Sequence, residues 1–526
     1  MPKIVIREFD NTTAVGASYA NFAVVVPGFR DTTIVDSPFD ENGVFECSTR
    51  KDFKEKIGLI APINHKVANA KAPTLAEGEE PRELTRAEFD ELVKNGTLYE
   101  VTPNTTAGIG KLKDAENIYI LATAENATNY EFKPEVTPDT PEATDEGEEE
   151  TPTYTQFVVL ADIGYDEIIQ SHYGNQIAWE LLGLGYTVLY KELQDTTYLE
   201  QESFWAPLKD KAAYDFRYII SGLLEGNSTI YQNMLKVAEF TPENEDFDDV
   251  DPLSYGRGDC IALLDIDAST YTGKSQLDAL TAITNSAMLS VPTSKYAAAF
   301  APSVTYNAKD LDNIKSFDDN NTFPASFHYL ACAARSAERF SEWYANAGYT
   351  RGVSKYNIAN VGCKFGEAAV NALQKRNTTE GKLNLAINPI LSLRGAYYIW
   401  GNRTTYPLGI KGAEDGDLKA SHFLNIRQLC CTIKKQVYVA CRQLTFSPNS
   451  DLLWINFCNS ITPMLDKMKA DQGIADYKII KVKNDRKAFL SATIRIVPIE
   501  AVEDFDISIH LEDSIGGTMV KAEEQE

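Results

Sequence analysis

The sequence predicts a multidomain mixed α/β fold, in which α/β and α+β parts combine. Two observations lead to it. Short apolar runs alternate with helical patterns between residues 157 and 324, as in layered α/β domains. Farther along, residues 489–496 and 505–511 alternate apolar and polar side chains, the pattern of half-buried strands. The 526 residues are enough for about three domains, and the 44% hydrophobic content supports a folded core.

The N-terminal part predicts two strands of different character. Residues 3–8 form a short alternating strand, followed by a polar run, and have no core of their own. This strand must lie on another element, of this chain or of another one. Residues 22–26 are continuously apolar, as in a buried strand, and Pro27 with Gly28 ends the run. A short helix is expected over residues 51–57.

Residues 61–156 differ from their surroundings in charge. Residues 62–156 hold 20 acidic and 8 basic side chains, and residues 133–155 are rich in Pro, Thr and Glu. This composition is typical of solvated loops. We therefore predict a peripheral acidic insertion.

Residues 157–324 predict a layered α/β region. Strands are expected at 157–161, 187–190, 218–221, 260–265 and 296–301, with helices at 173–184, 227–239 and 275–287. Asp265 and Asp267 follow a strand end, where α/β folds often bind ligands. An enzyme that binds a nucleotide or small ligand here is the alternative hypothesis. No nucleophile, base or glycine-rich phosphate loop accompanies the two aspartates, which disfavours it.

Residues 418–444 predict one long helix with two faces, capped by Ser421. An apolar stripe recurs at steps of three and four; its members are Ile426, Leu429, Cys430, Ile433, Val437, Cys441 and Leu444. Arg427, Lys434, Lys435 and Arg442 share a separate basic sector. This sector is either an ordinary solvated face or a surface for an acidic partner. Further helices are predicted at 325–346, 366–374 and 452–469, the last interrupted near Pro463, and strands at 395–400 and 477–482.

Charge is distributed unevenly along the chain. The net charge of −26 is the sum of −30 over residues 1–324 (25 basic, 55 acidic), +12 over 325–495 (24 and 12) and −8 over 496–526 (1 and 9). Such asymmetry favours self-complementary assembly or an acidic partner for the basic block. Plain solubility is the simpler interpretation of the acidic excess.

Motifs for catalysis or cofactor binding do not stand out. The five His and eight Cys lack metal-ligand spacing, and the scattered Cys indicate a reducing environment. We expect no enzyme activity, cofactor or metal. Nucleic-acid binding is disfavoured, because basic runs interleaved with aromatic residues are missing. No signal peptide or bilayer-spanning segment is predicted.

The basic block resembles the contractile tail sheath family of bacteriophage type. The resemblance lies in RGVSKYNIANVG, NLAINPI and GAYYIWGNRTT within residues 351–405. The long helix, FSPN, the helix with Trp454, GIADYKI and SATIRIVPIEAVEDFDISIHLE follow in the family's order. At the other end, KIVIREFDNTT resembles the sheath N-terminal arm. The likeness covers residues 325–511 well and 1–30 moderately, and it is poor over 61–156.

The resemblance implies five parts. Residues 1–20 form an N-terminal linking arm, and 21–60 with 325–498 form the conserved inner domain. Residues 61–156 are the outer insertion, 157–324 a middle α/β domain, and 499–526 a C-terminal linking arm. It also implies a virion tail sheath, assembled in the host cytoplasm, which polymerises helically around a tail tube and contracts to drive the tube through the cell envelope. The partners that the resemblance implies are further copies of the chain in hexameric rings, the tube protein, and the baseplate and terminator proteins. It implies no insertion of the chain into a membrane.

Two sets of residues are candidates for these contacts. A lone strand is stabilised by joining a sheet edge, and a neighbouring subunit's edge serves as well as its own. The candidates for such inter-subunit strands are Ile4, Ile6, Phe505, Ile507, Ile509 and Leu511. The candidates for facing the tube are Arg427, Lys434, Lys435, Arg442, Lys467 and Lys469.

Overall fold

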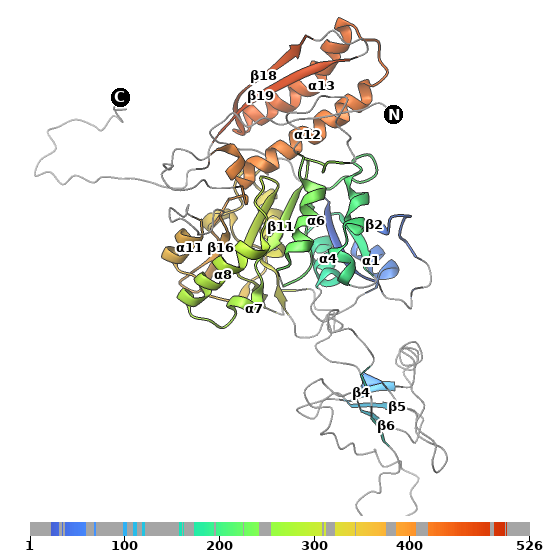
Figure 1. Cartoon of the computed structure of the whole chain (residues 1–526), viewed down its shortest axis with the longest axis vertical. Helices are drawn as coiled ribbons and strands as arrows, with labels where there is room; N and C mark the ends of the chain where they lie inside the picture. The colour runs from blue at the N-terminus through green and yellow to red at the C-terminus, as the bar shows by residue number, and fades with distance from the viewer. Residues whose placement is uncertain are drawn as a thin grey trace, which may run out of the picture.

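The protein is described from a computed structural model (Figure 1). The described residues are 23–30, 34, 37–58, 173–193, 196–224, 226–240, 254–307, 310–311, 321–341, 343–374, 386–406, 419–483, 489–499 and 501. The backbone of short strands between 68 and 162 is described as well. The predicted mixed α/β class is confirmed.

An eight-stranded sheet organises the body, in the order β17-β16-β12-β11-β10-β1-β9-β2. The six central strands run parallel, and an antiparallel strand borders them on each side. In chain order the strands are β1 Val24–Phe29, β2 Val44–Cys47, β9 Val188–Leu193, β10 Tyr218–Ile219, β11 Ile261–Asp265, β12 Ala297–Ala301, β16 Asn388–Leu393 and β17 Ala396–Ile399. Their apolar runs are continuous because both faces of the sheet are covered.

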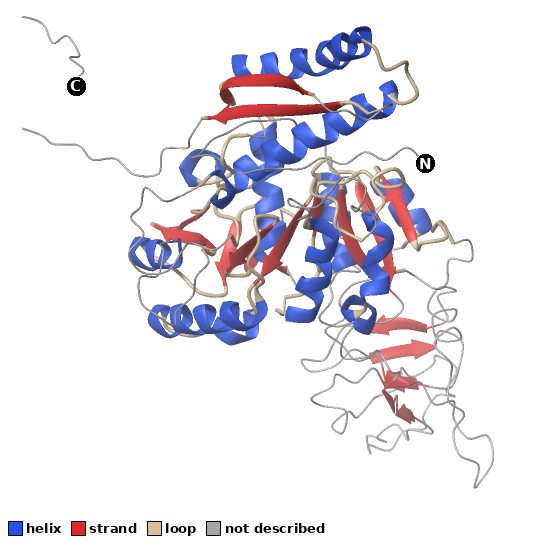
Figure 2. Ribbon diagram, turned by 45° about the horizontal axis from the view of Figure 1, so that its top comes forward, coloured by secondary structure: helices blue, strands red, loops and turns tan. Residues whose placement is uncertain are grey.

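Helices cover both faces of this sheet (Figure 2). On one face, Val25 and Ala262 pack with α6 Ser228–Ala238, α8 Gln276–Ser290 and α11 Glu367–Gln374. On the other, Val24 and Leu263 pack with α1 Arg50–Lys56, α4 Gly174–Gly183 and α9 Ala325–Ala337. Adjacent side chains of one strand thus enter opposite cores, as strand geometry requires.

This sheet crosses the predicted domain boundary at residue 324. It takes β1 and β2 from 21–60, β9 to β12 from 157–324, and β16 and β17 from 325–498. The predicted inner and middle domains therefore share one continuous sheet and its two cores.

A second layer lies beyond one end of the body (Figure 1). It consists of α12 Leu424–Leu444, α13 Asp451–Ala470 and a hairpin of β18 Ile474–Val482 and β19 Ser491–Pro498. Its own core joins Leu429, Phe457, Ile461, Leu465 and Ile474. We call α12, α13, β18 and β19 the hairpin layer.

Smaller elements complete the described chain. The short helices α5 Glu202–Trp205, α7 Ala268–Tyr271 and α10 Gly348–Arg351 lie in connections. A small antiparallel sheet joins β13 Val304–Tyr306, β14 Thr322–Phe323 and β15 Ile358–Val361. Most of the predicted insertion lies outside the described residues. The backbone there forms β3 Ala68–Asn69, β4 Leu98–Val101, β5 Ile109–Leu112 and β6 Ile118–Ile120, with β7 Phe157–Val159 and β8 Ala161–Asp162 following.

Four local predictions need correction. Strand β1 does not end at Pro27 and Gly28 but continues through them to Phe29, paired with β9 along its length. The helix predicted to reach residue 346 ends at Ala337, and its buried residues are Ala325–Ala333 and Ser336. Helix α13 continues through Pro463, which lies on an exposed face of the helix. Helix α12 begins after Phe423 without a side-chain cap, because Ser421 lies in a preceding 3₁₀ turn.

Candidate interaction surfaces

Helix α12 lies between the body and the rest of the hairpin layer, and its two faces differ. The apolar stripe packs largely as predicted: Leu429, Ile433 and Val437 are buried against α13 and the hairpin, with Cys441 and Leu444 partly buried beside them. The opposite face meets the body mainly through polar groups. Gln428 donates to the hydroxyls of Tyr218 at 2.7 Å and Tyr329 at 2.5 Å.

Three of the predicted tube-facing residues are buried on this second face, so the prediction is wrong for them. Arg427, Lys434 and Lys435 are 1%, 7% and 7% exposed. Lys434 Nζ donates to the Gly258 carbonyl at 3.0 Å and to the Tyr296 hydroxyl at 3.1 Å. The Arg427 guanidinium stacks 4.7 Å from the centre of the Tyr296 ring. Three of the four residues of the basic sector therefore meet this chain's own body.

A buried carboxylate anchors the contact. Asp259, 3% exposed, accepts from Arg257 Nε at 2.8 Å, and its Oδ2 lies 3.9 Å from Lys435 Nζ. Burial alone would raise the pKa of Asp259, but the charges of Arg257, Lys435 and Lys211 lower it below its usual range. Lys435 also pairs with Asp215, whose side chain is 78% exposed and so well screened. Asp259 is thus the principal anion of this contact.

Sequence analysis did not single out Arg257 and Asp259. Arg257 Nη1 also donates to the carbonyls of Leu208, Asp210 and Tyr214, at 3.2, 3.3 and 2.7 Å. Gly258 between them has a φ of +71°, and a Cβ there would lie 2.8 Å from the Cβ of Phe240. The available signal was an Arg-Gly-Asp turn directly before a buried strand.

The remaining basic candidates lie on the surface of the hairpin layer. Arg442, Lys467 and Lys469 are exposed. Lys469 Nζ is 2.8 Å from an Asp476 carboxylate oxygen, and both side chains are about half exposed or more. Leu452 and Ile455, on the same helix as the two lysines, are 63% and 51% exposed. Helix α13 thus carries exposed apolar side chains near its start and exposed lysines near its end.

The hairpin has two open edges. Within the described residues, β18 pairs only with β19 along a register from Ile474 opposite Pro498 to Val482 opposite Ser491. Each strand therefore has one edge at which no described strand is bonded. A two-stranded sheet is only marginally stable unless further strands join it or another element packs against it. Helix α13 packs against one face of this hairpin. The predicted arm residues Ile4, Ile6, Phe505, Ile507, Ile509 and Leu511 lie outside the described residues.

Asp265, the centre of the alternative enzyme hypothesis, has a structural role. Its carboxylate accepts from the Ser326 N–H at 2.8 Å and the Ser326 hydroxyl at 2.5 Å, at the start of α9. Burial raises the pKa of Asp265 to about 7, against the opposing effect of these hydrogen bonds. Asp267 caps α7 by accepting from the Ser269 N–H at 2.9 Å. Both carboxylates are thus engaged in holding helices.

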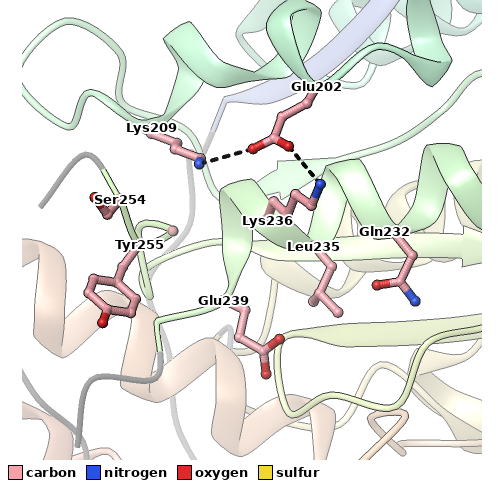
Figure 3. Close-up of a pocket in the computed structure, with 9 residues that line it drawn as sticks. Glu202, Lys209, Gln232, Leu235, Lys236, Glu239, Ser254 and Tyr255 are labelled. Carbon is pink, nitrogen blue, oxygen red and sulfur yellow. Dashed lines mark hydrogen bonds and ion pairs between the residues drawn. The ribbon is translucent and has the colours of Figure 1, made fainter.

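A polar pocket of about 300 Å³ lies elsewhere, between α5, α6 and residues 254–256 (Figure 3). Glu202 pairs there with Lys236 at 2.6 Å and with Lys209 at 3.8 Å. Glu239 lies at its other end and accepts from Ser294 at 3.0 Å. At the Glu202 end one carboxylate is thus held by two lysines of the lining.

The described histidines and cysteines behave as core residues. Burial lowers the pKa of His328 to about 3, so the ring is neutral, with Nδ1 2.6 Å from the Tyr306 hydroxyl. All eight cysteines are free thiols. Among the residues that the structure describes, no cluster of potential metal ligands occurs. In the same part of the chain, no helix has the length and apolar character to cross a membrane.

The chain is similar to solved structures of contractile assemblies. The first is the sheath complex of an extracellular contractile injection system, PVC, in the contracted state, with 11% identity, 98% of each chain covered and a TM-score of 0.49. The second is the anti-feeding prophage baseplate, with 13% identity, 64% of this chain and 80% of that chain covered, and a TM-score of 0.44. The third is the sheath tail protein of Desulfitobacterium hafniense, with 9% identity, 94% and 100% coverage, and a TM-score of 0.39. No protein-family model and no curated protein sequence matches the chain.

Proposed function

We propose that this chain is the structural subunit of a contractile tail sheath. It polymerises as a helical sheath around a tail tube and contracts to drive the tube through the target cell envelope. The observation that carries the proposal is the hairpin of β18 and β19, whose two outer edges pair with no described strand, in a chain with a strand pattern at each terminus. The sequence resemblance to tail sheaths supports the same function.

The two terminal arms link subunits in this proposal. Residues 3–8 and 505–511 each add to an edge of a neighbouring subunit's hairpin, so that two strands become a four-stranded sheet. Main-chain hydrogen bonds supply the attraction in this kind of strand addition. Head-to-tail contacts that do not close produce helical filaments. The same copies then form hexameric rings and stack along the tail.

The tube, baseplate and terminator proteins are the other proposed partners, and the virion tail is the proposed location after assembly in the host cytoplasm. Arg442, Lys467 and Lys469 are the tube-facing candidates that lie on the surface. Contraction is a switch between two packings of rigid bodies that the arms keep connected. The energy is stored at assembly, so the proposal needs no enzyme activity, nucleotide or cofactor.

Electron microscopy of the purified chain tests the arms. At high concentration the full chain is expected to form striated hollow tubes in negative stain. Deletion of residues 503–526 is expected to leave soluble monomers that keep every described helix and strand, because the last of these, β19, ends at Pro498. Tubes of normal appearance from the deleted chain would refute the linking role of the C-terminal arm.

Charge reversal tests the tube-facing surface. Lys467→Glu with Lys469→Glu is expected to abolish assembly around the tube and to leave the melting temperature nearly unchanged, because both side chains are exposed. Lys51→Glu with Lys54→Glu is the matched control, since both lysines are exposed on α1 of the body, away from the hairpin layer. Equal tube binding by the first double variant and the control would remove Lys467 and Lys469 from the interface.

A further inference from the structure

A cluster of half-exposed aromatic side chains lies beside the β17 edge of the main sheet. Tyr349 of α10 is 52% exposed and contacts two residues of the β17 region in edge-to-face geometry. Its ring centre lies 4.9 Å from that of Tyr398 and 4.8 Å from that of Trp400. Tyr398 and Trp400 are themselves only half-buried. These three rings form a continuous aromatic surface.

A second aromatic group surrounds Arg351 of the same short helix. The Arg351 guanidinium lies 5.4 Å from the ring centre of Phe340 and 5.3 Å from that of Tyr344, and its Nε donates to the Ala345 carbonyl at 2.8 Å. Phe340, Tyr344 and Arg351 are all half-buried. We call Phe340, Tyr344, Tyr349, Arg351, Tyr398 and Trp400 the α10 aromatic cluster.

A backbone hydrogen bond ties together α10 and the β17 region, which carry most of the cluster. The Ile399 N–H donates to the Gly352 carbonyl at 2.9 Å, which ties the end of α10 to β17. A Cβ at Gly352 would lie 2.4 Å from the Ile399 carbonyl oxygen, so the close approach requires glycine. Such a fixed surface of Tyr, Trp and Arg has the composition of protein-binding hot spots.

The charge around the cluster favours an acidic occupant. Residues 334–356 carry four basic side chains and two acidic ones, a net charge of +2, in a chain of net charge −26. Arg335, Arg339 and Lys355 are exposed. A partner segment that packs on aromatic rings and carries negative charge would match both the rings and the positive charge of this surface.

This chain contains a segment of that chemistry. Residues 133–155 hold four prolines, including the Pro138-Asp139-Thr140-Pro141 run, with eight acidic residues and one lysine. Proline-rich segments favour the polyproline II conformation and bind surfaces lined by aromatic side chains. We propose that the α10 aromatic cluster binds the acidic, proline-rich segment 133–155 of a second copy of this chain. This goes beyond the sheath function and does not depend on it.

A labelled synthetic peptide of residues 133–155 tests the proposal by fluorescence anisotropy. Two receptors are used: the full chain, and the full chain with residues 133–155 replaced by a Gly/Ser stretch of equal length. Both are expected to bind the peptide. Tyr349→Ala should weaken binding about tenfold, as expected for loss of an aromatic hot spot. Tyr198→Ala truncates an exposed tyrosine that is distant in the sequence from the cluster, and it should leave peptide binding unchanged.

Two further peptides separate the causes of binding. A peptide with all four prolines replaced by alanine is expected to bind at least tenfold more weakly, because the free peptide no longer favours the polyproline II conformation. A peptide with its carboxylates changed to amides is expected to bind more weakly and to lose most of its dependence on salt. The proposal would be overturned if the alanine peptide bound as tightly as the parent peptide. It would also be overturned if the Tyr349→Ala chain bound the parent peptide as tightly as the unchanged chain does. Binding to the replaced chain alone would overturn the second copy as occupant, because the chain's own segment would then fill the surface.

Discussion

The body and the hairpin layer solve the problem of sheet edges in opposite ways. The eight-stranded sheet has helices on both faces and short antiparallel strands at both borders, and one border is tied to α10 by a backbone hydrogen bond. The hairpin is packed by α13, and each of its strands leaves one edge open to other strands among the described residues. Unpaired edges are usually covered because they recruit other chains. The difference suggests that the body provides stability and the hairpin layer provides contacts for assembly.

Helix α12 joins these two regions through chemically different faces. Toward α13 it presents Leu429, Ile433 and Val437, which contribute to one apolar core. Toward the body it presents Lys434, Lys435 and Gln428, which use hydrogen bonds and an ion pair. The apolar contact tolerates small shifts, whereas the polar one requires defined partners. The orientation of the hairpin layer on the body is therefore set by the polar face.

The largest effect is expected at this polar contact. Asp259→Ala leaves Arg257 and Lys435 without their buried carboxylate, which should lower the free energy of unfolding by about 3–5 kcal/mol. Chemical denaturation measures this loss. Asp267→Ala is the matched control, because it removes only a helix cap, worth about 1 kcal/mol. A loss at Asp259 no greater than the control's would mean that the contact is not what orients the layer.

A somewhat smaller loss is expected on the apolar face. Leu429 is fully buried, so Leu429→Ala should lower the free energy of unfolding by about 2–4 kcal/mol. Ile455→Ala, on an exposed site of α13, should change it by less than about 0.5 kcal/mol. Urea denaturation followed by tryptophan fluorescence distinguishes these cases. Equal effects at the two positions would argue against a separate core in the hairpin layer.

The body should also show a specific dependence on pH. Because the pKa of Asp265 is raised to about 7 in the fold, the folded protein binds a proton that the unfolded chain loses near pH 4. Its contribution to stability is complete below pH 4 and disappears as the pH rises toward 7, by at most about 1.4 kcal/mol per pH unit. Asp265→Asn keeps an oxygen acceptor for the Ser326 N–H and should remove this slope. The same slope in both proteins, measured by denaturation between pH 4 and 8, would assign it to another group.

The success of the sequence-based predictions depended on how local each signal was. The runs at 260–265 and 296–301 were recognisable as buried strands, and the two faces of the helix over 418–444 followed from its periodicity. Periodicity separates a basic face from an apolar one, but it does not reveal what covers the basic face. Lys434 and Lys435 were therefore assigned to a partner, although Gly258 and Asp259, over 170 residues earlier in the sequence, cover them. Likewise, composition did not show that one sheet crosses the boundary predicted at residue 324. The pairing of β12 with β16 across that boundary joins segments that are distant in the sequence, so no local pattern reveals it.

Hydrogen exchange of the assembled and unassembled chain tests the central claim most directly. If arms add to the hairpin, the outward-pointing amides of Ile474–Val482 and Ser491–Val497 should become protected on assembly, while the amides of β11 and β12 in the body stay unchanged. The chain lacking residues 503–526 should show no such protection at the same concentration. Protection that rises equally in the body and the hairpin, or assembly without any change in the hairpin, would contradict the assignment of these edges as the site of subunit linkage.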